Sequence, residues 1–565
     1  MPWDIRLDHD SYEQARDEFT WADIPDDYNI ASDCLRKHDD PRGSVALFQH
    51  SAAGTETYTF HDLDVLSNQF AHALAARGVE RGDRVGVVVP QKPANPLTHL
   101  ACWKLGAISL PLSVLFGEDA LGYRLSDADV DVAVVDESVR DTVETVRGDA
   151  VDLEHVIVVD GEGSDDADGR GDGDGLGDTV RFADAIAGQP RQHDIADTDH
   201  ETPALILYTS GSTGPPKGVL HTHGLWLGHC PAFCMYFEHE IDRSVYWTPA
   251  DWAWIGALGD LLFPAWHYGR PVVGYPMGSF DPEEAFEIMA EYGVTETFLP
   301  PTAIRMMMNV DDPDGRYDLA LRAICSGGEP LTPEILDWAD ETLDGVAVNE
   351  LYGQTEANLL VSNCQSWFPA QAGSMGKPVP GHDVAVVDQE TGKEKEVGEV
   401  GMIAVRRGGD PVIFEEYWNK PEKTAAASVT GPDGTEWHLT EDLGYRDEDG
   451  YFWFKARDDD VIITAGYRVG PGEVESAILE DPDVEQVGVV GVPHETRGEI
   501  IKAFVQPVAG VTGDDALRER IRNGVRDRLA QYEYPREIAF VDELPTTTTG
   551  KIQRRKLRER EDEEE

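Results

Sequence analysis

Apolar and polar positions near the start of the chain follow a repeating β-α-β pattern. A stripe of apolar residues with helical spacing runs through residues 63–74 and ends at Gly78, and a continuous apolar run follows at residues 85–89. A second helix at 96–106 and apolar runs near Ile108 and at 132–135 continue the pattern. This order predicts a layered α/β domain with parallel strands.

A polar, glycine-rich segment follows the next apolar run, residues 204–207. It reads YTSGSTGPPKG over residues 208–218. Glycines bring backbone N–H groups close to an anion, and hydroxyls and a lysine complete a phosphate site. It is not a Walker loop, because prolines precede Lys217 and a glycine follows it. The alternative is a flexible linker, which two prolines and a lysine disfavour. The candidate phosphate-binding residues are Thr209, Ser210, Gly211, Ser212, Thr213, Gly214 and Lys217.

Two further segments carry candidate chemistry. The first, AICSGGEPL at 323–331, pairs a short strand with a glycine turn that permits close approach to a flat ligand. The second, ELYGQTE at 350–356, offers Tyr352 as an aromatic face and Thr355 as a hydroxyl for phosphate. Glu356 supplies a carboxylate oxygen that suits Mg²⁺ held mainly by substrate phosphates.

Composition narrows the class of protein. The chain has 565 residues, 41% of them hydrophobic, and a formal net charge of −60. Such a charge repels itself in dilute buffer and is screened in molar salt, so we expect a halophile with a salt-rich cytosol. The alternatives are an acidic tail or disorder, but the charge is spread over regularly apolar segments. No basic stripe indicates nucleic-acid binding, and no apolar run is long enough for a membrane span.

The start of the chain carries neither a basic nor an apolar region of a signal peptide, so we expect a cytoplasmic protein. The six cysteines are scattered, which is typical of reduced, buried thiols. Cysteines 230 and 234 and histidines 221, 223 and 229 fit no closed zinc pattern well. Residues 161–178 are too polar and glycine-rich to pack, and predict a solvated insertion; a calcium loop is the alternative, without EF-hand spacing.

These motifs, in this order, resemble the adenylate-forming superfamily, and specifically an acyl-CoA synthetase of the medium-chain type. The resemblance runs from about Tyr28 to Leu557. It implies a large N-terminal AMP-binding domain of layered α/β subdomains (1–458) and a small mobile α+β C-terminal lid domain (459–565). Asp459 would be the hinge, and ATP, Mg²⁺ and coenzyme A would bind. The partners would be small molecules, with a homo-oligomer possible.

The resemblance also assigns roles to residues. Lys551, Thr213 and Glu356 would be catalytic, with Glu356 holding Mg²⁺, and Asp442 and Arg457 would grip the ribose; a surface salt bridge is the alternative for that pair. The remaining ATP- or AMP-binding residues would be Gly327, Gly328, Glu329, Pro330, Glu350, Leu351, Tyr352, Gly353, Gln354 and Thr355. The CoA-binding residues would be Ala465, Gly466, Tyr467, Arg497 and Arg526. The acyl substrate would meet His223, Trp252, Gly353 and Arg468.

Two positions bear on the acyl group and on CoA. Acetate-specific relatives place a tryptophan where this chain has Gly353, so we expect a deeper chamber and a medium-chain fatty acid. Core packing alone would also explain the tryptophans at 252, 254 and 266. Leu115 stands where relatives have a glutamine near the CoA channel, which is a departure from the pattern.

The reaction that the resemblance implies has two halves. A carboxylate attacks the α-phosphorus of MgATP and releases pyrophosphate, and the thiol of CoA then attacks the acyl-adenylate after the small domain swings about Asp459. The alternatives are a ligase for branched-chain, aromatic or short-chain acids, a peptide-synthetase-type adenylation domain, a luciferase-like oxygenase and a non-catalytic binding protein. The last would be expected to have lost Lys551 or Glu356, and both are present.

Overall fold

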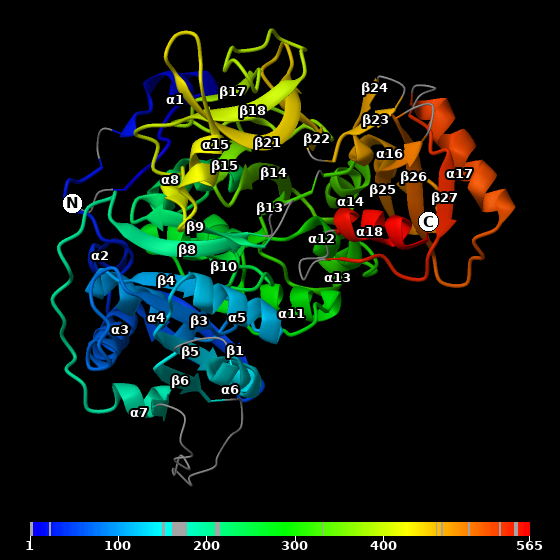
Figure 1. The fold of residues 1–565 in the computed structure, drawn as a ribbon. Coiled ribbons are helices and arrows are strands. Elements are labelled where there is room, and N and C mark those ends of the chain that lie inside the picture. The colour runs from blue at the N-terminus through cyan, green and yellow to red at the C-terminus, as the bar shows by residue number, and fades with distance from the viewer. Residues whose placement is uncertain are drawn as a thin grey trace. The chain divides into compact units, whose positions relative to one another are not determined.

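A computed structural model describes residues 4–21, 24–149, 153–160, 178–209, 215–329, 331–458, 460–464, 467–494, 498–529, 533–546 and 552–564. The chain forms two compact units (Figure 1). The first comprises Met1–Val384, Val405–Ser428 and Gly434–His438, and the second comprises Ala385–Ala404, Val429–Asp433 and Leu439–Glu565. The predicted boundary at Asp459 falls outside the described residues and stays a prediction.

One sheet of the first unit has eight strands. In spatial order they are β19 (Glu416–Tyr417), β9 (Lys217–Thr222), β8 (Pro203–Thr209), β4 (Ile108–Pro111), β3 (Arg84–Val88), β5 (Val132–Asp136), β6 (His155–Val159) and β7 (Asp178–Arg181). The strands from β8 to β7 are parallel, and β9 and β19 add antiparallel partners. The predicted parallel α/β layer is therefore confirmed.

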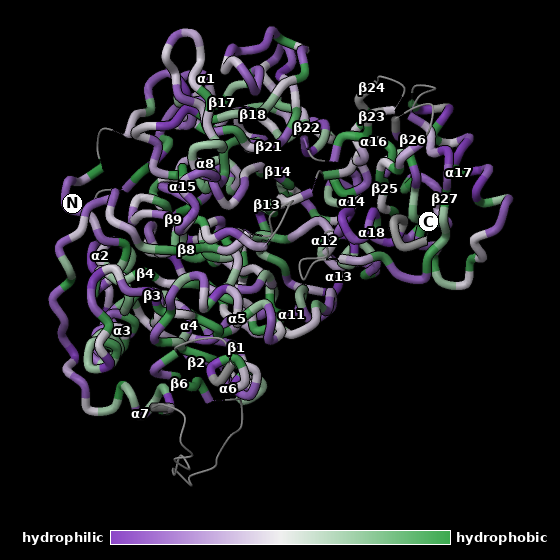
Figure 2. Tube along the Cα trace, viewed as in Figure 1, coloured by the Kyte–Doolittle hydropathy of each residue, from purple (hydrophilic) through white to green (hydrophobic). Residues whose placement is uncertain are grey.

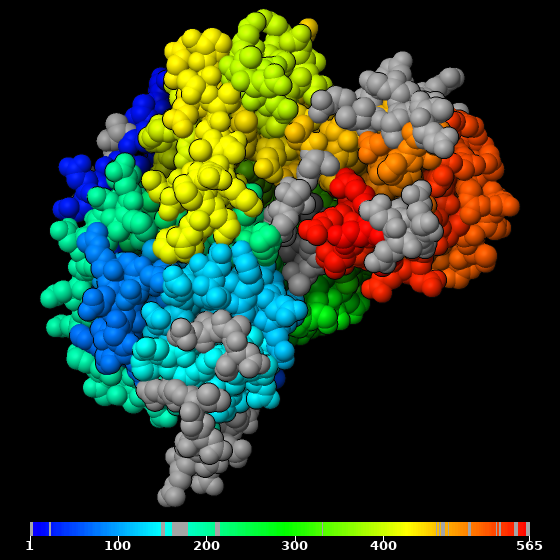
Figure 3. All heavy atoms as spheres, viewed as in Figure 1, coloured from blue at the N-terminus to red at the C-terminus, as the bar shows by residue number. Residues whose placement is uncertain are grey.

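Helices cover both faces of this sheet because its strands are apolar on both sides. Val88, Ala133 and Val156 pack with α5 (Glu118–Asp127) and α6 (Arg140–Asp149). The alternate strand residues, such as Val87 and Val134, pack with α3 (Phe60–Ala75), α4 (Ala94–Leu105) and α7 (Phe182–Ile186). In the space-filling view, the light-blue residues of α5 form part of the surface (Figure 3).

The other sheet of the first unit has nine strands, ordered β16 (Lys377–Pro378), β15 (Ala357–Ser362), β14 (Ala347–Gln354), β13 (Ala323–Gly327), β12 (Glu296–Phe298), β10 (Tyr246–Trp247), β11 (Val272–Gly274), β1 (Val45–Ser51) and β2 (Gly54–Thr59). The run from β14 to β1 is parallel. Three helices share one apolar cluster with it, namely α11 (Pro282–Tyr292), α12 (Pro301–Met307) and α14 (Pro333–Thr342). The described helices of the unit also include α1 (Tyr12–Glu18), α2 (Ile30–Arg36), η2 (Glu137–Val139), α8 (Leu225–Tyr236), α9 (Ile255–Ala257), η3 (Leu258–Leu262), α10 (Phe263–His267), α13 (Pro313–Arg316) and α15 (Pro421–Ala426).

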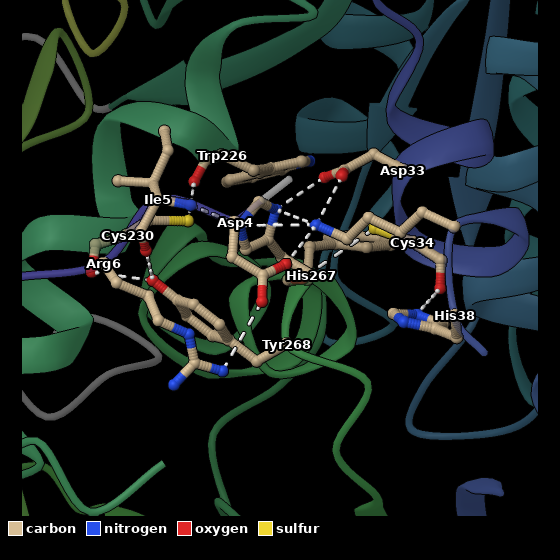
Figure 4. A network of polar contacts seen from close by, with 12 residues as sticks. Asp4, Ile5, Arg6, Asp33, Cys34, His38, Trp226, Cys230, His267 and Tyr268 are labelled. Carbon is tan, nitrogen blue, oxygen red and sulfur yellow. Dashed lines mark hydrogen bonds and ion pairs between the residues drawn. The ribbon is translucent and has the colours of Figure 1, made fainter. Parts of the chain in front are cut away.

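The first described residues are tied to the body of the unit by a buried polar network (Figure 4). The backbone N–H of Ile5 donates to Nε2 of His267 (3.2 Å), and Nδ1 of His267 lies 2.8 Å from Oδ2 of Asp33. Lys37 pairs with Asp33 (2.8 Å) and Asp4 (3.2 Å). Burial raises the pKa of Asp33, but His267 and Lys37 outweigh it and hold that pKa below its usual range. The network therefore fixes this segment against α2 and α10.

The second unit contains most of a five-stranded sheet and the whole of another. The strands of the first are β17 (Val384–Val387), β18 (Gly401–Arg406), β21 (Glu436–Arg446), β20 (Ser428–Thr430) and β22 (Phe452–Arg457). Those of the second are β24 (Tyr467–Val469), β23 (Ile462–Thr464), β26 (Gly498–Pro507), β25 (Val484–His494) and β27 (Glu537–Phe540).

Helices pack on both faces of the sheet that contains β26. Helices α16 (Pro471–Leu479) and α17 (Asp515–Arg528) share one apolar cluster with it, and Leu557 of α18 (Arg554–Glu564) belongs to another. Apart from its residues in the first of these clusters, α17 is mostly hydrophilic, and its tube is largely purple (Figure 2). The strands pair mainly antiparallel, which is the predicted α+β arrangement.

Two smaller predictions have different outcomes. All six cysteines are free and buried, as predicted. The predicted solvated insertion, 161–178, lies outside the described residues except at Asp178, which begins β7. Within the described ranges, no helix is long and apolar enough to cross a membrane.

Candidate active site

The GGE turn and the YGQTE segment meet at one edge of the nine-stranded sheet. Strands β13 and β14 are parallel neighbours, with Gly327 paired to Leu351. The carboxyl ends of parallel strands lie at the same edge of a sheet, where α/β proteins bind ligands. Strands β10 and β12 run parallel to β13, so their carboxyl ends lie at this edge too. The fold therefore assembles segments that are more than a hundred residues apart in the sequence.

The glycines of the GGE turn are required by the backbone. A Cβ at Gly327 would lie 2.4 Å from Cδ1 of Leu351 and 2.8 Å from its carbonyl oxygen. Gly328 has a φ of +89°, a conformation that other residues rarely adopt. The turn can thus pass directly over the end of β14 and leave its peptide face open to a flat ligand. Pro330 lies outside the described residues.

Glu350 holds this turn in place. Its buried Oε2 accepts a hydrogen bond of 2.9 Å from the backbone N–H of Leu331, the residue that follows the turn. Burial raises the pKa of Glu350 to about 8, although the Leu331 N–H opposes the shift. Glu350 therefore links β14 to the turn as a largely protonated carboxyl at neutral pH.

Glu356 is positioned by a tyrosine from a distant segment. The hydroxyl of Tyr417 donates to Oε1 of Glu356 (2.8 Å), and the backbone N–H of Phe414 donates to the backbone carbonyl oxygen of Glu356 (2.8 Å). The Glu356 side chain is largely buried, with the residue 8% exposed. The ammonium of Lys217 lies 4.2 Å from the centroid of the Tyr417 ring, a cation–π contact.

The predicted phosphate-binding segment begins and ends on paired strands near Glu356 and Tyr417. Thr209 of β8 pairs with Lys217 of β9, and Val219 pairs with Tyr417 of β19. The Lys217 end of the YTSGSTGPPKG segment thus lies on the strand next to the one that carries Tyr417, and the Thr209 end lies on the following strand. Ser210, Gly211, Ser212, Thr213 and Gly214 lie outside the described residues, so their contacts stay predictions.

Two buried histidines flank the YGQTE segment, and the sequence did not identify them. Nε2–H of His221 donates to the carbonyl oxygen of Thr355 (2.6 Å), and Nε2 of His438 lies 3.2 Å from Oε1 of Gln354. Burial lowers the pKa of His221 to about 4 and that of His438 to about 3, so both are neutral. The sequence signal was the HTH string at 221–223, from which the prediction named His223 alone as a neighbour of the acyl substrate.

His223 lies away from this edge. Its Nδ1 accepts from the backbone N–H of Ile30 at the start of α2 (3.2 Å), and its backbone N–H donates to the carbonyl oxygen of Thr202. Burial lowers its pKa to about 3. The structure therefore gives His223 a role in anchoring α2, and does not support its placement on the acyl chamber. Trp252 is fully buried, and a Cβ at Gly274 would lie 2.9 Å from its ring.

The structure gives Gly353 a different role from the pocket floor that the sequence suggested. A Cβ at this position would lie 2.2 Å from the backbone nitrogen of Leu359 and 2.9 Å from Cα of Asn358. The glycine permits the irregular pairing of β14 with β15, where the register shifts between Tyr352 and Gln354. The absent side chain therefore faces the neighbouring backbone and not open space.

In the second unit, Asp442 and Arg457 lie side by side and form the ion pair that was the alternative to a ribose contact. They are directly paired on β21 and β22, and Nη1 of Arg457 lies 3.4 Å from Oδ1 of Asp442. Arg457 also donates to Oε2 of the exposed Glu441 (2.9 Å). Asp442 is buried and Arg457 half-buried. The pair presents an acceptor and a donor side by side, which is what two ribose hydroxyls require, and that contact stays a proposal.

The other predicted site residues are described only in part. Arg526 of α17 lies with its guanidinium carbon 4.1 Å from the centroid of the Tyr534 ring. Leu115, the departure noted above, is 63% exposed. Tyr467 and Arg468 pair with Thr464 and Ile463 in the β23–β24 hairpin. Asp459, Ala465, Gly466, Arg497 and Lys551 lie outside the described residues. Across the described ranges, no group of three or more His, Cys, Asp or Glu side chains could hold a metal ion.

Comparison with known proteins decides the family. The model of the AMP-binding enzyme family matches residues 36–418, and that of the AMP-binding enzyme C-terminal domain matches residues 473–551. The chain belongs to the AMP-binding enzyme family. The first match includes the strands that carry the candidate site, namely β8, β9, β13, β14 and β19. The second match lies within the second compact unit.

The similarity to individual relatives covers nearly the whole length of the chain. It is 34% identical over 572 residues to "Acetyl-coenzyme A synthetase" of Bacillus subtilis (strain 168), a match that covers 98% of this chain and 96% of the relative. It is 32% identical over 564 residues to "Acyl-coenzyme A synthetase ACSM3, mitochondrial" of Mus musculus, covering 98% and 93%. The adenylate-forming superfamily and a ligase are thus confirmed, whereas a halophilic origin is not tested.

Solved structures agree with this assignment. The anthranilate CoA ligase AuaEII in complex with anthranoyl-AMP superposes with a TM-score of 0.83 at 28% identity, covering 97% of this chain and 99% of that one. ATP-bound MatB from Rhodopseudomonas palustris gives a TM-score of 0.80 at 30% identity, covering 94% and 98%. The predicted fold class is confirmed.

Proposed function

We propose that this chain is an ATP-dependent acyl-CoA synthetase that forms an acyl-adenylate and transfers the acyl group to coenzyme A. The observation that carries the proposal is the convergence of the GGE turn, the YGQTE segment and the ends of the phosphate-binding segment described above. Relatives that are named acetyl- and acyl-coenzyme A synthetases support the same reaction.

In the first half-reaction, a carboxylate oxygen of the acid attacks the α-phosphorus of ATP, and the bond to pyrophosphate breaks. The GGE turn would receive the adenine, and Lys217, Thr209 and Thr355 would meet phosphate oxygens. Glu356 offers a carboxylate next to the Tyr417 hydroxyl, and this fits Mg²⁺ that is held mainly by phosphates. When bound, Mg²⁺ supplies Lewis-acid stabilisation of the phosphate charge.

In the second half-reaction, the CoA thiolate attacks the acyl carbon and AMP leaves with the former carboxylate oxygen. Asp442 and Arg457 would hold the ribose, and Arg526 would contact CoA. The roles of Lys551 in adenylation and of Ala465, Gly466, Tyr467 and Arg497 in CoA binding stay proposals on the sequence resemblance.

For the acyl group we propose a medium-chain acid. Trp254, Ile255 and Gly256 are half-buried beside the sheet edge and offer mainly apolar walls. Each buried methylene contributes about 0.8 kcal/mol, so longer chains gain binding energy until the chamber is full. Because a side chain at Gly353 would face backbone, the proposal rests on these walls and not on that glycine.

A panel of acids tests the function. Purified protein in molar KCl is given ATP, MgCl₂ and acetate, butyrate, hexanoate, octanoate, isovalerate or benzoate, and AMP release is measured with and without CoA. Medium-chain acids should give CoA-dependent turnover and a thioester in equal amount to AMP. ADP as product, or thioester formation without AMP, would contradict the proposal; a preference for benzoate or acetate would overturn only the choice of acid.

A further inference from the structure

Two side chains of α5 contact both ends of the predicted phosphate-binding segment. The hydroxyl of Tyr208, which begins the segment, donates to Oδ2 of Asp127 (2.7 Å). The hydroxyl of Tyr123 donates to the carbonyl oxygen of Pro216 (2.9 Å), directly before Lys217. Tyr123 and Asp127 are four residues apart on α5, so they lie on one face of the helix. One helix face therefore holds both ends of the segment.

The two ends also lie against each other. Tyr208 of β8 pairs with Gly218 of β9, and a Cβ at Gly218 would lie 3.2 Å from Cζ of the Tyr208 ring. The rings of Tyr123 and Tyr208 meet edge-on, with their centroids 6.3 Å apart. Tyr208 is 7% exposed, and burial together with Asp127 raises the pKa of Tyr208, so its hydroxyl keeps the proton that it donates.

Asp127 has a third partner, which comes from the segment that positions Glu356. Nζ of Lys420 lies 3.0 Å from Oδ1 and 3.1 Å from Oδ2 of Asp127, and each of these two side chains is 19% exposed. The backbone N–H of Lys420 donates to the carbonyl oxygen of Tyr417 (2.9 Å), the residue whose hydroxyl donates to Glu356. One carboxylate therefore connects α5, the start of the phosphate-binding segment and the chain that holds Glu356.

We propose that Asp127 is a positioning residue for MgATP, which fixes the ends of the phosphate-binding segment relative to Glu356 before the nucleotide binds. The inference rests on the proposed function and adds to it a residue that acts through its neighbours. A binding segment that is held in its binding arrangement loses less conformational freedom when the ligand binds. When the competent arrangement is populated less often, the apparent Kd for the nucleotide rises in inverse proportion.

The test measures the affinity for α,β-methylene-ATP with Mg²⁺ by isothermal titration calorimetry in molar KCl, and the KM for MgATP and kcat in CoA-dependent AMP release. Tyr208→Phe removes one donor to Asp127 and keeps the ring, and Asp127→Ala removes the carboxylate. Each variant should weaken binding of the analogue by about tenfold and raise the KM for MgATP in step. The kcat at saturating ATP should stay nearly unchanged, because saturating nucleotide restores the competent arrangement.

Further variants separate positioning from a general loss of stability. The double variant of Tyr208→Phe and Asp127→Ala should bind the analogue no more weakly than Asp127→Ala alone, because both changes remove the same hydrogen bond. Asp127→Asn, which keeps an acceptor for Tyr208, should lose less affinity than Asp127→Ala. Lys420→Met should raise the KM for MgATP, whereas Lys420→Arg, which keeps the ion pair, should bind nearly as well as wild type.

Tyr28→Phe is the matched control, because the Tyr28 hydroxyl also donates to an aspartate, Asp33 (3.0 Å), in the network around His267. Its affinity for the analogue should equal that of wild type. Wild-type affinity in folded Tyr208→Phe and Asp127→Ala, or a lower kcat with an unchanged KM, would overturn the inference; Tyr208→Phe decides if Asp127→Ala does not fold. Analogue binding with these variant effects, but without AMP release from any acid, would refute the proposed function alone, whereas wild type that does not bind the analogue would refute both.

Discussion

The hydroxyl of Tyr417 offers a direct test of how Glu356 is positioned. It donates a 2.8 Å hydrogen bond to Oε1 of a glutamate that is 8% exposed, so little water can replace it. Tyr417→Phe removes this one donor and leaves the aromatic ring, and with it the Lys217 contact at 4.2 Å.

The size of the effect follows from the charge that Glu356 would carry when it holds Mg²⁺. A hydrogen bond to a charged group contributes about 1.5–3 kcal/mol, which corresponds to roughly 10- to 150-fold in an equilibrium constant. If Glu356 holds the metal of MgATP, that loss should appear as weaker MgATP binding and slower adenylation. Thioester formation from supplied acyl-AMP, which needs no MgATP, should be nearly unchanged.

Two measurements check the prediction. The first is the Mg²⁺ dependence of pyrophosphate release, and the second is the affinity for Mn²⁺ with ATP, followed by the paramagnetic resonance of free Mn²⁺. Tyr12→Phe is the matched control, because the buried Tyr12 hydroxyl donates to the neutral carbonyl of Pro378 (2.9 Å) far along the chain. A folded Tyr417→Phe variant with wild-type Mn²⁺ affinity and pyrophosphate release would refute the assigned role.

Four further predictions follow from the charges and the packing. Glu350 has a pKa of about 8 in the folded protein, above the value of about 4.5 for an exposed glutamate, so its contribution to stability is present in acid and declines as the pH rises toward 8. Between pH 5 and pH 8 the Tm of Glu350→Gln should therefore fall less than the Tm of wild type. Parallel Tm curves for the two proteins would contradict the burial argument. Gly353→Trp should lower the Tm sharply and not shift the chain-length preference, because its Cβ would meet the Leu359 backbone; a stable variant with a shorter-chain preference would restore the chamber-floor explanation. Activity and folding should need molar salt because of the net charge of −60, and a protein that is stable and fully active in 50 mM KCl would exclude this. Lys551→Ala should reduce adenylation by several orders of magnitude and spare the thioester step, and equal loss in both would contradict its assignment.

The sequence predicted the elements whose patterns are local. The helical stripe at 63–74 became α3, and the apolar runs at 85–89 and 132–135 became β3 and β5, because strands that are apolar on both sides leave few other arrangements. The segment at 323–331 likewise became a short strand, β13, followed by a glycine turn, as its pattern predicted.

Contacts between distant segments could not be read from the sequence. Tyr417 reaches Glu356 only because β19 pairs with β9, and nothing in the local pattern indicates that pairing. The prediction named His223 and not His221, which lies two residues earlier. The spacing in the sequence does not show which of the two contacts the YGQTE segment, because that contact depends on the tertiary packing around β9. Gly353 was explained by a missing side chain, whereas the cause is a register shift against β15.

The central proposal, activation of a carboxylate through an acyl-adenylate, can be tested by following one oxygen atom. Hexanoate labelled with ¹⁸O in its carboxylate is turned over with ATP, Mg²⁺ and CoA in molar KCl, and the nucleotide product is analysed by mass spectrometry. Because the carboxylate oxygen that attacks the α-phosphorus leaves with the nucleotide, each AMP should carry one ¹⁸O and hexanoyl-CoA should form in equal amount. Unlabelled AMP, or labelled phosphate together with ADP, would contradict the proposed chemistry.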